Sequence, residues 1–277
     1  MPEGPEIRLA ADAVATAIAG RPVQEVYFAF DHLRPFAAAL QGERVTAVTS
    51  RSKAIITRFA NGLNIYSHNQ LYGQWWVRPA YDFPDTNRQL RLAIHNHTHS
   101  ALLYSASEIE VLTTAELAEH PYLRKLGPEL LDEAVTEAEV AARFGDGRFQ
   151  RRRLTSLLLD QSFLAGMGNY LRSEVLFVAS VHPSLRPIDC TPAQIQRLAA
   201  AALQLTRQSY RTKGITNDLQ LVEKLKAQGV PRHDYRFWVF NRDQQPCHRC
   251  GTAIARETMG GRRCYYCPFC QAVRSEK

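Results

Sequence analysis

The chain has 277 residues, of which 45% are hydrophobic and 22% charged, so it is long enough for two domains and too polar for a membrane or coiled-coil protein. No apolar stretch approaches the roughly 20 residues that span a bilayer, and no basic leader precedes an apolar run, so we expect a cytoplasmic protein. The net charge of +7 is uneven: residues 1–149 contain 14 Lys and Arg against 18 Asp and Glu, whereas residues 150–277 contain 20 against 9. The second half is therefore expected to attract a polyanion such as DNA or RNA.

The N-terminal part predicts one helix followed by a β-sandwich. Pro5 suits the first position of a helix and Gly20 its stop, and between them an apolar stripe recurs at helical spacing, formed by Ile7, Ala11, Val14 and Ile18. From residue 23 to residue 103, short β-prone runs are broken by Gly, Asn and Pro, which is typical of an antiparallel sandwich. The runs are residues 26–30, 45–50, 55–59, 63–68, 75–77, 90–95 and 101–104.

The C-terminal part predicts helices, so the chain as a whole is expected to be α+β. Residues 113–131 contain two proline breakers and are expected to link two domains, with a boundary near Leu131. A glycine-rich turn at 165–168 is expected between predicted helices at 154–161 and 169–180. Helices are predicted at 136–145, 154–161, 169–180 and 192–210, and the first and last begin with capping-box spacing, Thr136 with Glu139 and Thr191 with Gln194.

Five of the six cysteines lie near the C-terminal end, where their spacing predicts a zinc site. The pairs Cys247-x2-Cys250 and Cys267-x2-Cys270 enclose 16 residues, which matches a site of four thiolates. Cys264-x2-Cys267 is also a permitted pair, but we prefer Cys270 because residues 267–270 form a compact turn that can aim two sulfurs at one ion. Four thiolates leave no open position for water, so we predict one structural Zn²⁺ that holds a β-hairpin.

Simpler interpretations are favoured for other candidate groups. Cys264 and Cys190 are expected to be packed thiols. His95, His97 and His99 alternate and could bind a metal from one strand face, but no acidic residue nearby supports them, so a solvated strand is favoured. The three arginines at 151–153 are expected to form a basic surface that faces phosphate.

The N-terminus offers an amine and two carboxylates. Removal of Met1 would leave the secondary amine of Pro2, and because a terminal amine has a pKa of about 7.7 to 8.0, a useful fraction is nucleophilic at neutral pH. Glu3 and Glu6 supply carboxylates for general acid and base chemistry close to that amine. Acidic residues are also favoured in a first helical turn, so position alone leaves a structural interpretation open.

Ordered motifs along essentially the whole chain resemble the formamidopyrimidine-DNA glycosylase and endonuclease VIII family. They are MPEGPEI at 1–7, RSKA at 51–54, DQ at 160–161 with GMGNY at 166–170, and the four-cysteine end. The endonuclease VIII branch is more similar, because Gly4 replaces the Leu of the purine-directed branch and residues 66–73 look like the pyrimidine-directed branch. The resemblance implies a β-sandwich catalytic domain at 1–131 with flanking helices, a helical helix-two-turn-helix domain at 132–235 and a zinc-finger β-hairpin at 236–277.

The resemblance also implies roles for the catalytic residues. Pro2 would be the Schiff-base nucleophile, Glu3 a proton donor, Glu6 a supporting carboxylate and Lys53 the proton donor for elimination. Without the resemblance, Lys53 would be interpreted as a solvated turn lysine. Arg262 stands where the family has the phosphate-binding arginine of its finger.

Three residues are expected to act in base extrusion. A nucleotide that leaves the duplex stack creates a vacancy, and Gln70, Leu71 and Tyr72 combine an amide, an apolar wedge and an aromatic plane that suit its filling. In isolation, Leu71 and Tyr72 would be interpreted as core residues.

Other residues are expected to bind the phosphates of damaged double-stranded DNA. Asn169 opens a predicted helix, so it could bind phosphate, serve as a plain N-cap, or do both. The resemblance implies DNA contacts for His68 and for Lys125, although Lys125 stands where an arginine is expected, so that charge is kept and bidentate geometry is lost. Glu174 is expected to orient the local network.

The implied activity is that of a bifunctional DNA glycosylase and AP lyase of base excision repair. It would excise oxidised pyrimidines through a Schiff base on Pro2, followed by β- and δ-elimination, with no organic cofactor. The open alternatives are a purine-directed formamidopyrimidine or 8-oxoguanine glycosylase and a non-catalytic zinc-finger DNA-binding protein. We expect a monomer that associates with the nucleoid through DNA binding.

Overall fold

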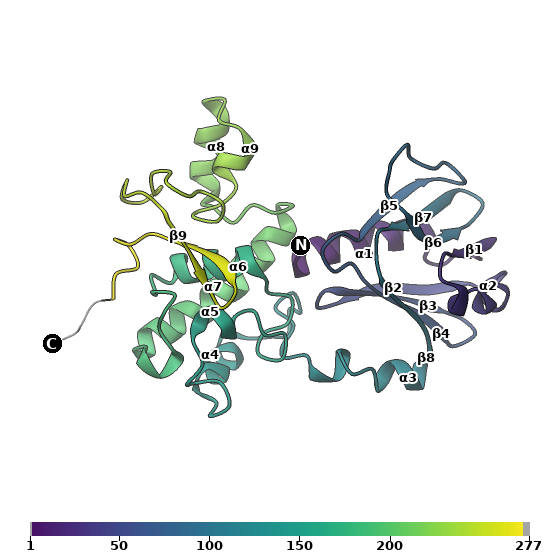
Figure 1. Cartoon of the computed structure of the whole chain (residues 1–277), viewed down its shortest axis with the longest axis horizontal. Helices are drawn as coiled ribbons and strands as arrows, with labels where there is room; N and C mark the ends of the chain where they lie inside the picture. The colour runs from purple at the N-terminus through teal and green to yellow at the C-terminus, as the bar shows by residue number, and fades with distance from the viewer. Residues whose placement is uncertain (1, 274–277) are drawn as a thin grey trace. The chain divides into compact units, whose positions relative to one another are not determined.

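The computed structural model describes residues 2–273, and the chain divides into two compact units between Lys125 and Leu126 (Figure 1). Each unit has its own hydrophobic core, and each is described separately below. Within residues 2–273, no helix combines the length and the apolar character that crossing a bilayer requires. A further division of the second unit at residue 235 stays a prediction.

The first unit is an antiparallel β-sandwich with helices at its edges, as the sequence predicts. One sheet has the strand order β1-β6-β7-β5 and the other β2-β3-β4-β8. The strands are β1 (Glu25–Phe28), β2 (Val45–Arg51), β3 (Ala54–Phe59), β4 (Leu63–His68), β5 (Gln74–Pro79), β6 (Leu90–His95), β7 (His99–Tyr104) and β8 (Glu108–Thr113). The helical elements are α1 (Gly4–Ile18), η1 (Asp31–Leu33), α2 (Pro35–Leu40), α3 (Thr114–Ala118) and η2 (Leu123–Lys125).

The core of this unit lies between its sheets and under α1. The predicted apolar stripe of α1 is fully buried, and the helix contacts strands of both sheets, β2 and β3 of one and β5 and β7 of the other. Figure 1 shows the two sheets of this unit as separate layers with α1 beside them. This packing fixes the first turn of α1 to the sandwich.

Strand β8 and helix α2 are among the elements of this unit that lie outside the sequence prediction. Strand β8 pairs with β4 along its whole length, with His68 opposite Glu108, although its glutamates weaken the β-propensity of the segment. Ile109 and Val111 alternate inward to the core, and the glutamates of the strand lie on the other face. Helix α2 is short and was also not predicted. Pairing with β4 therefore stabilises β8 although the β-propensity of its own sequence is low.

The second unit contains helices and one β-hairpin. Its elements are α4 (Glu137–Gly145), α5 (Leu154–Leu157), α6 (Asn169–Val178), η3 (Pro187–Asp189), α7 (Pro192–Arg211), α8 (Leu219–Ala227), α9 (Arg232–Tyr235), β9 (Ala255–Met259) and β10 (Arg262–Tyr266). The two predicted caps are confirmed, since Thr136 Oγ1 accepts from Glu139 N at 3.2 Å and Thr191 Oγ1 from Gln194 N at 3.3 Å.

The helix predicted at 154–161 is shorter in the structure, where α5 ends at Leu157. The Asp160 carboxylate accepts from both the backbone N and the hydroxyl of Ser162, at 2.8 and 2.7 Å. Such local side-chain bonds to the backbone compete with helix continuation. The chain therefore turns here and reaches the start of α6 through a glycine-rich segment.

The β9–β10 hairpin turns at Gly260 and Gly261, which join Met259 to its partner Arg262. Both glycines have positive φ, +61° and +75°, a backbone region that other residues adopt only with strain. The glycine pair thereby permits the tight turn that exposes Arg262 next to the tip.

Candidate functional site

The N-terminal candidates lie at the first turn of α1. Glu3 is the N-cap residue and is only 3% exposed, and Pro2, directly before it, is half-buried. The Glu3 backbone N donates to Glu6 Oε2 at 3.0 Å, so Glu6 closes the first turn in the manner of a capping box. Both carboxylates are favoured at the positive end of the helix. The structure thus places a buried carboxyl group immediately beside Pro2.

Lys53 lies in the two-residue turn between β2 and β3. It is 7% exposed, so the interpretation as a solvated turn lysine is wrong. Its neighbour Ser52 has φ +56°, and the Tyr122 hydroxyl donates to Ser52 Oγ at 3.0 Å. Residues 113–131 were predicted only as a link, and Tyr122 within them holds this turn.

His68 ends β4 close to Lys53. Burial lowers the pKa of His68, and the nearby Lys53 ammonium lowers it further, against the raising effect of the Glu108 carboxylate. The His68 ring meets the Tyr122 ring edge-on at 5.5 Å, and His68 Nδ1 accepts from Gln70 N at 3.0 Å. Because Nδ1 accepts, the neutral ring carries its proton on Nε2, which is a donor suited to a phosphate oxygen.

The extrusion candidates follow in the turn between β4 and β5. Leu71 is 58% and Tyr72 71% exposed, so their interpretation as core residues is wrong. The turn closes through Gly73 N, which donates to Asn69 O at 2.7 Å, and a Cβ at Gly73 would lie 2.6 Å from that oxygen. Gln70 is exposed and has φ +49°. An apolar and an aromatic side chain are therefore displayed together on a tight turn.

The histidine row does not form a metal site. His95 ends β6, His97 lies in the connecting turn and His99 begins β7, so the three do not share one strand. Each histidine has its own partner. Ser100 Oγ lies 2.6 Å from His95 Nδ1, Gln24 bonds His97, and Arg21 bonds His99. His95 is also buried and stacks on Tyr81, so the prediction of a solvated strand is wrong for it.

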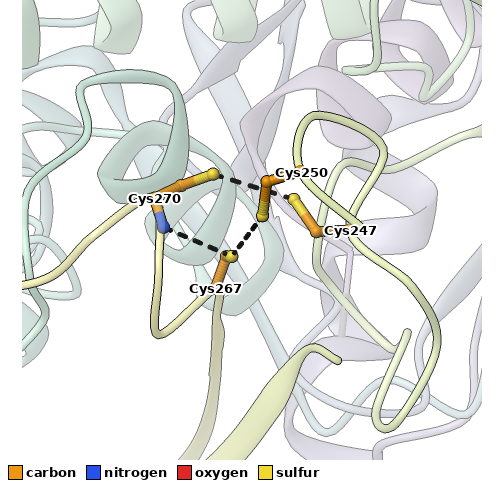
Figure 2. A group of neighbouring side chains, drawn as sticks. All are labelled: Cys247, Cys250, Cys267 and Cys270. Carbon is orange, nitrogen blue, oxygen red and sulfur yellow. Dashed lines mark hydrogen bonds between the residues drawn. The ribbon is translucent and has the colours of Figure 1, made fainter. Parts of the chain in front are cut away.

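Four cysteines gather at the C-terminal end of the second unit, as Figure 2 shows. The sulfurs of Cys247, Cys250, Cys267 and Cys270 all lie within 4.8 Å of one another. Two sulfur pairs are 3.9 and 3.5 Å apart, near the about 3.8 Å that a tetrahedron with Zn–S bonds of about 2.3 Å requires. This donor set fits one structural zinc ion.

The remaining cysteines lie elsewhere. Cys264 is buried within β10 opposite Glu257, and burial raises the pKa of its thiol. Cys190 is half-buried beside η3, where burial raises its pKa to about 11. Both are protonated, packed thiols at neutral pH.

Asn169 begins α6, but it is not the cap, because Gly168 occupies that position. The Asn169 side chain instead donates to Arg263 O at 2.9 Å and accepts from Arg172 at 2.7 Å. Arg172 is fully buried and also donates to Arg263 O at 2.8 Å. Helix α6 is thereby bonded to strand β10, the strand that begins with the exposed Arg262.

Glu174 is buried one turn further along α6. Its carboxylate accepts from Thr216 Oγ1 at 2.5 Å and from the backbone N of Trp238, Val239 and Phe240 at 2.8 to 2.9 Å. These bonds hold the segment that leads into the cysteine-bearing region, in line with the expected orienting role.

Other basic candidates are exposed. Lys125 is the last residue of η2 and lies on the surface. Of the arginines at 151–153, Arg152 is paired with Asp160 at 2.6 Å, and the other two are exposed. A basic surface of this kind can attract phosphates.

Sequence reasoning missed Ser107, Glu108 and Tyr122. Their partners, Gln70 and Ser52, lie 37 to 70 residues away along the chain. No motif contains them, so only the folded sandwich could reveal them.

Each of the two units matches the model of a known protein family. The model of the formamidopyrimidine-DNA glycosylase N-terminal domain matches residues 1–107, and that of the formamidopyrimidine-DNA glycosylase H2TH domain matches residues 126–220. Endonuclease 8 of Klebsiella pneumoniae is 44% identical over 98% of this chain and all of the relative. The chain belongs to the formamidopyrimidine-DNA glycosylase family. The predicted class, a DNA glycosylase with AP lyase activity, is thereby confirmed.

Further comparisons agree with membership of the glycosylase family. Endonuclease 8 of Salmonella heidelberg is 45% identical over the same coverage. A crystal structure of Lactococcus lactis formamidopyrimidine-DNA glycosylase bound to DNA with an AP site has a TM-score of 0.80 at 18% identity, covering 98% of this chain and 99% of that one. The predicted fold is confirmed by this likeness.

Proposed function

We propose that this glycosylase excises oxidised pyrimidines from damaged double-stranded DNA as a monomer, with the amine of Pro2 as its nucleophile. The observation that carries the proposal is Glu3, a carboxyl group only 3% exposed that adjoins Pro2 at the first turn of α1. Full-length similarity to endonuclease 8 supports the pyrimidine preference. Met1, whose removal frees the amine, lies outside the described residues.

Base release is proposed to begin at C1′ of the damaged nucleotide. The lone pair of Pro2 forms the N–C1′ bond as the glycosidic bond breaks, and the base leaves with the proton that the Pro2 nitrogen gives up. Glu3 donates a proton to the ring oxygen as its bond to C1′ opens, which leaves an iminium between Pro2 and the sugar. Glu6, which bonds the Glu3 backbone at 3.0 Å, keeps this turn in place.

Strand cleavage then follows from the iminium. Its positive nitrogen acidifies the neighbouring C2′ proton, and loss of that proton expels the 3′ phosphate in β-elimination. A second elimination expels the 5′ phosphate and leaves a one-nucleotide gap. Lys53, 7% exposed, supplies a proton for elimination, and Arg262 compensates phosphate charge.

DNA binding is proposed for residues of both units. His68, through Nε2, together with Lys125 and Asn169, binds phosphates, and Gln70, Leu71 and Tyr72 fill the space left by the extruded nucleotide. The exposure of Leu71 and Tyr72 supports that role, because large apolar side chains this exposed suggest a binding surface. Zinc at the four cysteines stabilises the finger and offers no open coordination position.

Borohydride trapping tests the nucleophile. With an oxidised-pyrimidine or abasic duplex, reduction is expected to give a covalent adduct that mass spectrometry maps to an N-terminal peptide lacking Met1. A protein whose N-terminus is blocked by an added tag serves as the control and is expected to give no adduct. An adduct on Lys53, or normal trapping by the blocked protein, would displace Pro2, and complete absence of an adduct would favour a non-catalytic DNA-binding protein.

Parallel cleavage assays test the lesion class. Duplexes with thymine glycol, dihydrouracil or 8-oxoguanine are compared under single-turnover conditions. Faster excision of the two pyrimidines is expected, and preference for 8-oxoguanine would favour a purine-directed glycosylase.

A further inference from the structure

The side chain of Gln70 is held by two residues that precede and begin β8. Gln70 Nε2 donates to Glu108 Oε2 at 2.8 Å, and Ser107 Oγ donates to Gln70 Oε1 at 2.8 Å. The backbone of Gln70 is held as well, since its N–H donates to His68 Nδ1 at 3.0 Å. Both ends of the amide therefore have a partner on a neighbouring segment.

Glu108 is itself held by a hydrogen bond from a buried residue. The hydroxyl of Tyr66 donates to Glu108 Oε1 at 3.1 Å, and Tyr66 is fully buried in a small cluster with Ala54 and Ile56. One carboxylate oxygen thus faces the buried phenol, and the other faces Gln70. Because Glu108 also pairs with His68 across β4 and β8, its position is fixed by the sheet.

These partners distinguish the two ends of the amide. An ionised carboxylate only accepts hydrogen bonds, so the NH₂ end of Gln70 must face Glu108. With that end fixed, the oxygen end accepts the Ser107 hydroxyl. A reversed amide would set its oxygen against the carboxylate and lose the bond to Glu108, whereas the Ser107 hydroxyl can donate or accept and would bond either end.

The held amide still has capacity to bind a base. Each amide atom makes one hydrogen bond in the structure, which leaves a second N–H on Nε2 and a second lone pair on Oε1. Gln70 is exposed beside Leu71 and Tyr72, so these groups can meet a base. The donor and the acceptor are presented in one fixed order.

This order matters for the base opposite a lesion. Along their pairing edges, adenine presents a donor and then an acceptor, whereas guanine presents an acceptor and then a donor. An amide that is free to reverse suits both purines. An amide of fixed order suits one purine and leaves unpaired polar groups with the other, which is expected to slow excision opposite that purine by about fivefold or more.

We propose that Glu108 fixes the orientation of the Gln70 amide, with Ser107 holding the oxygen end in place, and so determines which purine opposite the lesion the protein prefers. The inference rests on the proposed function, because it assigns Gln70 to the unpaired opposite base. Glu108 and Ser107 are positioning residues in this assignment, since they act through Gln70.

The test measures single-turnover excision of dihydrouracil placed opposite adenine, opposite guanine or opposite an abasic residue. The variants are Glu108→Gln, Ser107→Ala and their combination. Glu110→Gln is the matched control, because Glu110 is the next carboxylate on the same face of β8 and contacts His120 at 3.4 Å. Glutamine at position 108 accepts and donates, so it tolerates either orientation of Gln70.

The wild-type protein is expected to differ about fivefold or more between the two purines. In the combined variant this ratio is expected to fall towards one, while excision opposite the abasic residue keeps its rate and Glu110→Gln keeps the ratio. Ser107→Ala removes the hydroxyl that holds Gln70 Oε1, so the amide can rotate away from Glu108 and the ratio is expected to fall. Because Ser107 is exposed, this variant is expected to fold even if the Glu108 variants fold poorly.

Other outcomes overturn the inference. They are a wild-type ratio of one, an unchanged ratio in both Ser107→Ala and the combined variant, or an equal loss of rate opposite the abasic residue. A wild-type protein that excises no dihydrouracil from any duplex contradicts the proposed function itself, which separates the two failures.

Discussion

Asn169 and Arg263 are joined by a hydrogen bond of 2.9 Å from the Asn169 side chain to the Arg263 backbone oxygen. The bond crosses from the first turn of α6 to β10, and the buried Arg172 reinforces it by bonding both residues. The residue expected to bind phosphate at a helix start is therefore part of the support for the strand that carries Arg262. Loss of Asn169 is therefore expected to affect both the finger and DNA binding.

Asn169→Ala is expected to loosen the hairpin and weaken DNA binding together. Removing the amide leaves Arg172 with one acceptor fewer, which costs about 1 to 3 kcal/mol of unfolding free energy. Hydrogen exchange of β9 and β10 is expected to speed up, and the affinity for an abasic duplex to fall. Gln196→Ala on the exposed face of α7 is the control. Unchanged exchange in the hairpin would contradict the supporting role.

Zinc content distinguishes the cysteines. The purified protein is expected to contain one zinc, retained in Cys264→Ser and lost in Cys267→Ser or Cys270→Ser, because only the latter remove sulfurs from the group within 4.8 Å. Elemental analysis measures the zinc content of each variant, and thermal unfolding measures the stability of the finger. Loss of zinc in Cys264→Ser with retention in Cys270→Ser would refute the ligand set.

Combined truncation of Leu71 and Tyr72 to alanine is expected to impair excision from duplex DNA more than cleavage of a preformed abasic site. Both side chains are more than half exposed, so the free energy of unfolding is expected to change by less than about 1 kcal/mol. Rates on both substrates and urea unfolding measure this. Equal rate losses on the two substrates would argue against a role in extrusion.

His68 is expected to titrate below its ordinary pKa of about 6.5 in the free protein. Its folded pKa is lowered, mainly by burial, so the unfolded chain binds the proton first as the pH falls. The free energy of unfolding is therefore expected to drop as the pH falls from about 7 towards the lowered folded pKa, and to flatten below it.

NMR titration of the imidazole and urea unfolding at several pH values measure this effect. His68→Asn, which keeps an acceptor for Gln70 N, is the matched variant and is expected to lose much of the pH dependence in this range. A His68 pKa above about 6.5 in the free protein would contradict the prediction.

Local patterns predicted many elements of the fold. The runs at 63–68 and 90–95 coincide with β4 and β6, because short runs of β-prone residues bounded by Gly, Asn and Pro are typical of strands. The spacing of Thr136 and Thr191 to their cap partners also predicted two helix starts, since capping depends on residues three positions apart. Helix α5 was overestimated because Asp160 and Ser162 form a turn that periodicity does not report.

The sequence by itself determined the family through motifs at residues 1–7, 51–54, 160–170 and the four-cysteine end, because those signals are local and ordered along the chain. Tertiary structure alone decided that Lys53 is buried, that Leu71 and Tyr72 are exposed, and that the histidines at 95, 97 and 99 take separate partners. It also decided which side chains hold the candidate site: Glu108 with Gln70, Tyr122 with Ser52 and Arg172 with Arg263. These partners are 38, 70 and 91 residues apart. Hydrogen bonds between such distant residues depend on how sheets and helices pack, and no local period or spacing encodes that packing.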